Sequence, residues 1–170
     1  MRGRCSSRPC ARRRQLMVAF KSRPAVASDS CPVKEGEGAM GDHPNAEALR
    51  KGYEAFAAGD METVASVLAD DIVWHQSGKS PLSGDFAGKD AVFGDYIARV
   101  AEVNAGTFGQ EIHDLLANDE HVVVLVDEWW QQPHPFRGKG VHVWHMKDGI
   151  ATEAWFTDQD QAAFDAALTP

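Results

Sequence analysis

Beyond residue 45, the hydrophobic and polar positions follow a helical period first and a strand period after residue 106. In the first of these stretches, apolar side chains recur three or four positions apart at Ala46, Leu49, Tyr53 and Phe56. This spacing places them on one face of a helix. Gly59 follows as a residue that ends helices. The pattern therefore predicts an amphipathic helix at the start of this region.

Two more helices and one strand are predicted before the period changes. Asp60 is suited to cap a second helix, and the polar run from Ala69 to Asp71 closes it. The segment 72–75 is β-branched and aromatic, which favours a short strand. Three glycines and a proline predict a loop over 77–88, and a third helix is expected over 89–103.

After residue 106 the apolar positions alternate, which indicates strands. Asp148 and Gly149 give a strong hairpin signal. Pro133 and Pro135 end a strand, because proline cannot donate to a sheet ladder. The predicted strands span 107–117, 121–132, 141–147 and 150–157, and a short helix follows over 160–168. Helices followed by consecutive strands predict an α+β fold, in which a curved antiparallel sheet is packed by helices on one face.

The segment 122–126 is apolar at every position. A strand with one face in water would alternate between apolar and polar residues. We therefore expect both faces of this strand to be buried, one against the helices and one against a second subunit. This expectation makes a homodimer the predicted assembly.

Four groups of residues give the chain a family resemblance. They are Gly59 with Asp60, the run from Leu68 to His75, the turns around Ser83 to Lys89, and Asp148 to Ile150. Together they resemble the nuclear transport factor 2-like superfamily, in its SnoaL-like and ketosteroid isomerase-like branch, over roughly residues 46–168. The resemblance implies a cone-shaped α+β barrel with an apolar pocket inside. It also implies any of several activities, since members include isomerases, cyclases, dehydratases, hydrolases and non-catalytic binding proteins.

The catalytic pattern of the ketosteroid isomerases does not transfer to this chain. The position of their carboxylate base falls on Gln76, and an amide cannot take a proton at neutral pH. Their tyrosine on the first helix falls on Gly52, and Tyr53 lies one residue, or about 100° of helix rotation, away. Their buried acid falls near His142. Steroid isomerisation by that mechanism is therefore not expected.

Strand alternation identifies other candidates for the pocket. His142 and Trp144 share one face of their strand, which the resemblance directs toward the cavity. Trp74 and Gln76 share a face of the first strand, and Phe156 shares the parity of Asp158. Tryptophan walls suit a flat apolar ligand, although they also suit a core or a subunit interface.

Two of these residues are the candidate catalytic groups. His142 has an ordinary pKa of about 6.5 and could act as acid or base. Asp158 could orient His142 or act as base, or it could simply cap the terminal helix. His75 reaches the pocket only if the first strand shifts by one residue, and strand parity could direct His113 into it. The predicted ligand-binding residues are Trp74, His75, Gln76, His113, Trp144 and Phe156.

Composition separates the chain into two parts. Of its formal net charge of −8, residues 1–39 contribute +6 and residues 40–170 contribute −14. Residues 1–40 are expected to be a disordered basic leader, interpreted as a translated upstream extension before Met40, a regulatory tail or a targeting segment. Residues 41–170 form the predicted SnoaL-like domain. All three cysteines lie in the leader.

These features exclude several functions for the domain. An acidic surface is a poor nucleic-acid binder, and no apolar run approaches the roughly 20 residues of a membrane helix. His142 and His145 are on opposite strand faces, so neither a metal nor another cofactor is expected. A cytoplasmic location is expected.

Three functions remain open. The first is an acid/base enzyme of isomerase, cyclase or dehydratase type, acting on an apolar carbonyl or polyketide-like substrate. The second is a non-catalytic protein that binds a small apolar ligand, and the third is a structural dimer with no ligand. The first rests on the family resemblance and on His142 with Asp158 near one cavity, and the second rests on Gln76 at the position of the family's base.

Overall fold

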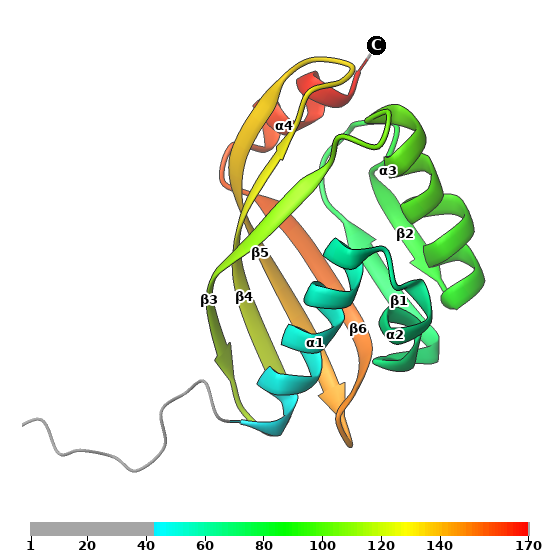
Figure 1. The fold of residues 1–170 in the computed structure, drawn as a ribbon, viewed down its shortest axis with the longest axis vertical. Coiled ribbons are helices and arrows are strands. Elements are labelled where there is room, and N and C mark those ends of the chain that lie inside the picture. Colours follow the sequence, from blue (N-terminus) through cyan, green and yellow to red (C-terminus); the bar gives the residue numbers. More distant parts are fainter. Residues whose placement is uncertain (1–42, 170) are drawn as a thin grey trace, which may run out of the picture. The chain divides into compact units, whose positions relative to one another are not determined.

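The computed structural model describes residues 43–169, and the predicted leader lies outside the described residues (Figure 1). The helices are α1 (Pro44–Ala58), α2 (Met61–Ser66), the π-helical turn η1 (Ala91–Ile97) continued by α3 (Ala98–Val103), and α4 (Gln161–Leu168). The strands are β1 (Leu68–Gln76), β2 (Gly84–Ala87), β3 (Gly109–Ala117), β4 (His121–Trp130), β5 (Phe136–Lys147) and β6 (Ile150–Asp158).

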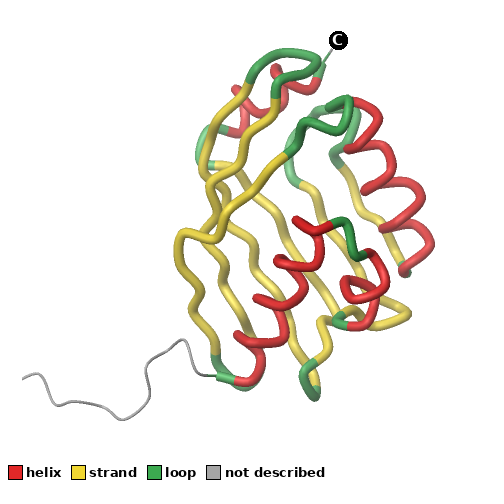
Figure 2. Tube along the Cα trace, in the orientation of Figure 1, coloured by secondary structure: helices red, strands yellow, loops and turns green. Residues whose placement is uncertain are grey.

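The six strands form one curved sheet in the order β2-β1-β6-β5-β4-β3 (Figures 1 and 2). Neighbouring strands are antiparallel except β1 and β6, which are parallel. The predicted α+β class with a curved sheet and packed helices is confirmed, and the expectation of a purely antiparallel sheet is corrected at this one pair. The predicted hairpin at Asp148 and Gly149 joins β5 to β6, and both residues have positive φ, as its turn requires.

Helix α1 begins where its sequence satisfies the first free backbone N–H groups. Pro44 occupies the first turn, and the His43 side chain accepts a hydrogen bond from the Asn45 N–H. Gly59 ends the helix with a φ of 76°, a conformation that glycine adopts without steric cost. The apolar face, with Ala46 and Leu49 fully buried, packs on the sheet.

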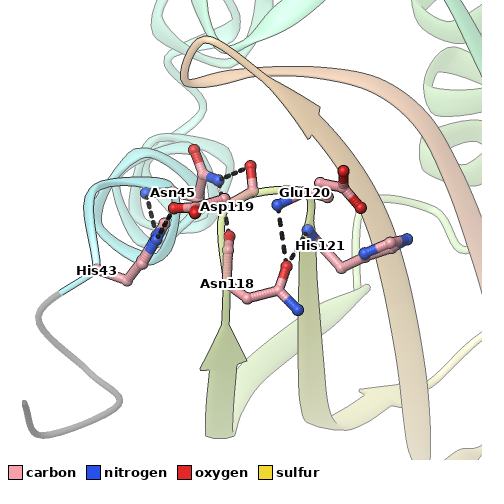
Figure 3. A network of polar contacts seen from close by, with 6 residues as sticks. All are labelled: His43, Asn45, Asn118, Asp119, Glu120 and His121. Carbon is pink, nitrogen blue, oxygen red and sulfur yellow. Dashed lines mark hydrogen bonds and ion pairs between the residues drawn. The ribbon is translucent and has the colours of Figure 1, made fainter.

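A polar network fixes the first turn of α1 to the turn between β3 and β4 (Figure 3). Asn45 Nδ2 donates to the backbone oxygens of Asn118, at 2.9 Å, and Asp119, at 3.0 Å. His43 Nε2 lies 3.1 Å from the Asp119 carboxylate. Asn118 Oδ1 accepts from the Glu120 and His121 N–H groups, which closes the turn itself. The network therefore sets where α1 starts over the sheet.

Several element boundaries differ from the sequence predictions. The run from Ala69 to Asp71 belongs to β1, which pairs with β6 from Leu68 onward, instead of closing α2. The predicted loop over 77–88 contains β2, a short edge strand paired with Val73–Gln76. An edge strand needs backbone partners on one side only, so its sequence can lack the apolar alternation that marks an inner strand. β5 begins at Phe136, five residues before the predicted start.

The central strand β4 alternates in burial, contrary to the expectation that both faces are buried. Val122, Val124 and Val126 are buried beneath the helices. Val123 and Leu125, on the other face, are only half-buried. The difference arises because the described residues contain no layer that covers this second face.

Candidate functional site

A cavity lies between the concave face of the sheet and the helices. Its volume is about 90 Å³, several times the roughly 10–15 Å³ that one water molecule requires. Most of its wall is apolar or aromatic, including Leu49, Phe56, Val64 and Phe108. The polar residues that line it are Tyr53, Gln76, Tyr96, Gln110, Glu128, His142 and Asp158. A small flat apolar molecule with few polar atoms matches this lining.

Six of the eight predicted site residues line this cavity: Trp74, Gln76, His142, Trp144, Phe156 and Asp158. The aromatic ones pack against one another. The Trp74 and Phe156 rings are stacked with centroids 4.0 Å apart. Trp144 stands edge-on to Trp74, with centroids 5.5 Å apart.

Three polar side chains lie in series across the cavity. The Tyr53 hydroxyl, from α1, lies 2.5 Å from His142 Nδ1, on β5. On the far side of the ring, His142 Nε2 lies 3.3 Å from Glu128 Oε1, on β4. Trp144 Nε1 donates to the Tyr53 oxygen at 3.2 Å. His142 and Glu128 are each 5% exposed, so this series is screened from water.

The donors and acceptors of this series assign the His142 tautomer. Trp144 Nε1 can only donate, and burial raises the pKa of Tyr53 well above its ordinary value. Tyr53 therefore keeps its proton and donates it to His142 Nδ1. A neutral imidazole then has its own proton on Nε2, the nitrogen that faces Glu128 Oε1. Every proton in the series is thus directed toward the Glu128 carboxylate.

Asp158 lies at the end of β6 and borders the same cavity. Burial, the negative charges of Glu128 and Asp165, and a hydrogen bond with Glu128 raise the pKa of Asp158 to about 8. Its Oδ1 is buried without a hydrogen-bond partner among the described residues. The alternative role as a helix cap is wrong, because Asp160 caps α4 by accepting from the Ala163 N–H.

The position of the family's base is filled by a neutral pair. Gln76 is 6% exposed, and its Oε1 accepts a hydrogen bond from the Tyr96 hydroxyl at 2.7 Å. Burial raises the pKa of Tyr96, and the charges of Glu128 and Asp158 raise it further. Gln76 and Tyr96 therefore shape and polarise the cavity without taking up a proton.

The remaining two predicted residues lie elsewhere. His75 points to the opposite face of the sheet, where it contacts Asp85 at 2.7 Å and Glu153 at 3.1 Å. Its side chain does not line the cavity, so the one-residue shift considered for β1 does not occur. His113 is exposed on β3 and lines a separate cleft beside α1, instead of the cavity. The structure thus gives neither histidine a place in the cavity wall.

Sequence reasoning missed Glu128 and Tyr96 and set Tyr53 aside. Glu128 lies on the same strand face as Val124 and Val126. A charged residue on an otherwise apolar strand face is the sequence feature that could have identified it. Tyr96 lies three positions after Phe93, on the face of the third helix predicted to point inward. Tyr53 reaches the cavity even though Gly52 occupies the family position, because the cavity spans a wide sector of α1.

Two further findings concern the described residues alone. Within residues 43–169, none of the helices is long and apolar enough to cross a membrane. In the same range, no three His, Cys, Asp or Glu side chains are grouped so that they could hold a metal ion.

The chain is similar in sequence to a known protein family. Residues 49–154 match the family model described as "SnoaL-like domain". The chain belongs to this SnoaL-like family. The match covers β1 to β5, the first half of β6 and all of the polar cavity residues except Asp158, which lies just beyond it.

Relatives and solved structures agree with this assignment. The uncharacterized protein Rv0034 of Mycobacterium tuberculosis is 30% identical over 87 residues, which are 51% of this chain and 66% of that protein. The chain thus spans just under two thirds of the length of the curated relatives it matches. An NTF2-like protein from Burkholderia pseudomallei K96243 is 25% identical, with a TM-score of 0.64 over 75% of this chain and 99% of that one.

A third similar structure is that of TerC, which was co-crystallized with polyporic acid. It is 25% identical, with a TM-score of 0.66 over 74% of this chain and 98% of that chain. The fold of this SnoaL-like protein is therefore that of the NTF2-like proteins, as the sequence resemblance predicted.

Proposed function

We propose that this SnoaL-like protein is an acid/base enzyme that forms an enol from a small, flat, apolar carbonyl compound, in a reaction of isomerase, cyclase or dehydratase type. One observation supports this proposal above the others. An apolar cavity contains both Asp158, a carboxyl group whose pKa is raised to about 8, and the polar series in which Tyr53 is hydrogen-bonded to His142 and His142 faces Glu128 at 3.3 Å.

The proposed roles follow from the chemistry of each group. Asp158 donates its proton to the carbonyl oxygen of the substrate, because it is an acid below about pH 8 with one oxygen unpartnered. His142 belongs to the polar series that receives a proton from the carbon next to the carbonyl. Trp74 and Phe156 form an apolar wall against the substrate ring. TerC, of the same fold, was co-crystallized with an organic acid, which supports a small-molecule ligand.

Hydrogen exchange tests the proposal without knowledge of the natural substrate. Indan-2-one is a flat ketone. The protons on the two carbons next to its carbonyl group exchange with deuterium oxide through the enol. We expect the protein to accelerate this exchange, measured by proton NMR, above the rate in buffer alone. Asp158→Asn is expected to slow the accelerated exchange about 10²- to 10⁴-fold, the usual contribution of a positioned acid.

Asp160→Asn is the matched control, since asparagine still caps α4 and the residue does not line the cavity. It should exchange the ketone at the rate of the unmodified protein. If the ketone quenches the cavity tryptophans on binding but does not exchange, the non-catalytic binding function is correct. The observation that favours that second function is the neutral Gln76 at the position of the family's base.

The uncovered face of the sheet supports a proposal about assembly. Val123, Val143 and Trp155 form a half-buried row across β4, β5 and β6. We propose that a second copy of the chain covers this row and forms a homodimer. Sedimentation velocity at micromolar concentration should then show dimers, and Val143→Lys should shift them to monomers, whereas Ala101→Lys on α3 should not. Monomers alone in the unmodified protein would contradict the dimer.

A further inference from the structure

Glu128 is a buried carboxyl group that the sequence pattern did not single out. It occupies the parity of β4 that otherwise contains Val122, Val124, Val126 and Trp130. Transfer of a carboxylate from water to such a face is costly unless partners compensate it. Part of the compensation comes from His142, whose Nε2 lies 3.3 Å from Glu128 Oε1, and Asp158 lines the same cavity.

The backbone leaves room for this arrangement at one glycine. Gly140, on β5, is paired with Val126 on one side and with Asp158 on the other. A Cβ atom at Gly140 would lie 3.5 Å from His142 Nε2, 3.6 Å from Glu128 Cδ and 3.0 Å from Val126 Cγ2. A Cβ atom there would crowd Val126 alone, while His142 and Glu128 lie at ordinary contact distance, so both side chains gather above Gly140.

Glu128 and Asp158 line the same cavity, from the two strands that flank β5. Burial and the negative charge of Glu128 raise the pKa of Asp158 to about 8, so Asp158 keeps its proton at neutral pH. His142 Nε2 faces Glu128 Oε1 at 3.3 Å, whereas Oδ1 of Asp158 has no hydrogen-bond partner among the described residues. The titratable groups around the pair are Tyr53 from α1, Tyr96 from η1, His142 from β5 and, beside Asp158, Asp165 from α4.

We propose that Glu128 is the catalytic base of the site, and that it takes the proton from the carbon next to the substrate carbonyl while Asp158 protonates the oxygen. This inference rests on the proposed enol-forming function and names the atom that receives the proton. The C–H electron pair becomes the C=C bond of the enol, and the carbonyl π pair takes the Asp158 proton. Glu128 ends protonated and Asp158 ends ionised.

This step conserves the charge of the buried pair. In the proposed step, the proton that Glu128 gains from carbon is matched by the proton that Asp158 gives to oxygen. No new charge is therefore created in the apolar cavity, where an additional charge would be costly. Return of the proton from Glu128 to a different carbon gives an isomer. In deuterium oxide, replacement of that proton by a deuteron before the return to carbon gives exchange.

His142 is not the base in this account. Its Nδ1 accepts from Tyr53, and its Nε2 faces Glu128, so neither nitrogen has a free lone pair for the substrate. It is a positioning residue, which holds the carboxylate of Glu128 in one orientation. The amide at Gln76 on β1 is then compatible with catalysis, because the proposed base is Glu128 on β4.

Indan-2-one exchange in Glu128 variants tests the assignment. Glu128→Gln should lower the exchange rate constant about 10²- to 10⁴-fold while ketone binding, measured by tryptophan fluorescence, persists. In Glu128→Ala, added acetate should restore exchange in proportion to its concentration, because it supplies the missing carboxylate. The matched control is Asp127→Asn, whose residue pairs with Lys139 on the opposite face of β4.

The outcomes separate this inference from the proposed function. If the unmodified protein binds the ketone without exchange, the proposed function itself fails. If the unmodified protein exchanges it and Glu128→Gln exchanges it equally fast, only the assignment of Glu128 is overturned. Loss of exchange in His142→Gln to the level of Glu128→Gln, together with absence of acetate rescue in Glu128→Ala, would instead make His142 the base.

Discussion

At the scale of single residues, environment decides which acidic groups act and which remain solvated. Asp127 and Glu128 are adjacent on β4 but face opposite sides of the sheet. Lys139 lies 2.8 Å from Asp127 and lowers its pKa on an exposed face. Glu128 faces the cavity and raises the pKa of Asp158 instead. One step along a strand thus separates a surface ion pair from a candidate catalytic base.

Prediction of the site from sequence succeeded where strand parity alone was enough. His142 and Trp144 line the cavity, as their alternation on β5 indicated. Glu128 was missed because its candidate role depends on the residues near it in space. In the chain, His142 is fourteen positions away and Asp158 is thirty positions away. Contacts between strands depend on register, which a single sequence does not fix. For the same reason His113 was predicted to bind ligand in the pocket. A bulge in β3 shifts the register beside His113, which strand parity alone could not indicate.

At the scale of elements, α1 is the helix that brings Tyr53 to His142. Its first turn is fixed to the β3–β4 turn by Asn45, and its last turn ends at Gly59. Between these ends, Gly52 lies so close to α2 that a Cβ atom there would be 2.9 Å from Val67 Cγ2. The close approach lets the helix settle over the sheet at a depth where the Tyr53 hydroxyl reaches the cavity.

Asn45→Ala tests this anchoring. The substitution leaves the backbone oxygens of Asn118 and Asp119 without their buried donor. We expect the free energy of unfolding, measured by urea denaturation, to fall by about 1–3 kcal/mol. Lys51→Ala, at an exposed position of the same helix, is the control and should change stability little. An equal effect of the two substitutions would show that the network does not anchor α1.

Element prediction succeeded where the pattern was local. The α1 helix and the β5–β6 hairpin follow from spacing and turn residues close together in the chain. β2 and the first residues of β1 were not predicted, because they are strands only through pairing with distant segments. The parallel pairing of β1 with β6 joins segments about eighty residues apart, and no local signal reports it.

At the scale of the whole described domain, the two faces of the sheet differ in what they contact. The concave face, with the helices, encloses the cavity and its carboxyl pair. The other face presents a half-buried apolar row together with the pairs that His75 forms with Asp85 and Glu153. The acidic balance of residues 40–170 is thus mostly a property of the exterior, and the few internal carboxyl groups are the chemically relevant ones.

The proposed chemistry requires that the cavity keep one carboxylic acid protonated at neutral pH. Carbon NMR of the protein, with isotope-labelled aspartate carboxyl groups, measures this directly when the signal is assigned by Asp158→Asn. We expect the Asp158 signal to titrate near pH 8, so that the acid is present below that pH and lost above it. A midpoint near the ordinary aspartate pKa of about 3.9 would contradict the role of Asp158 as the acid.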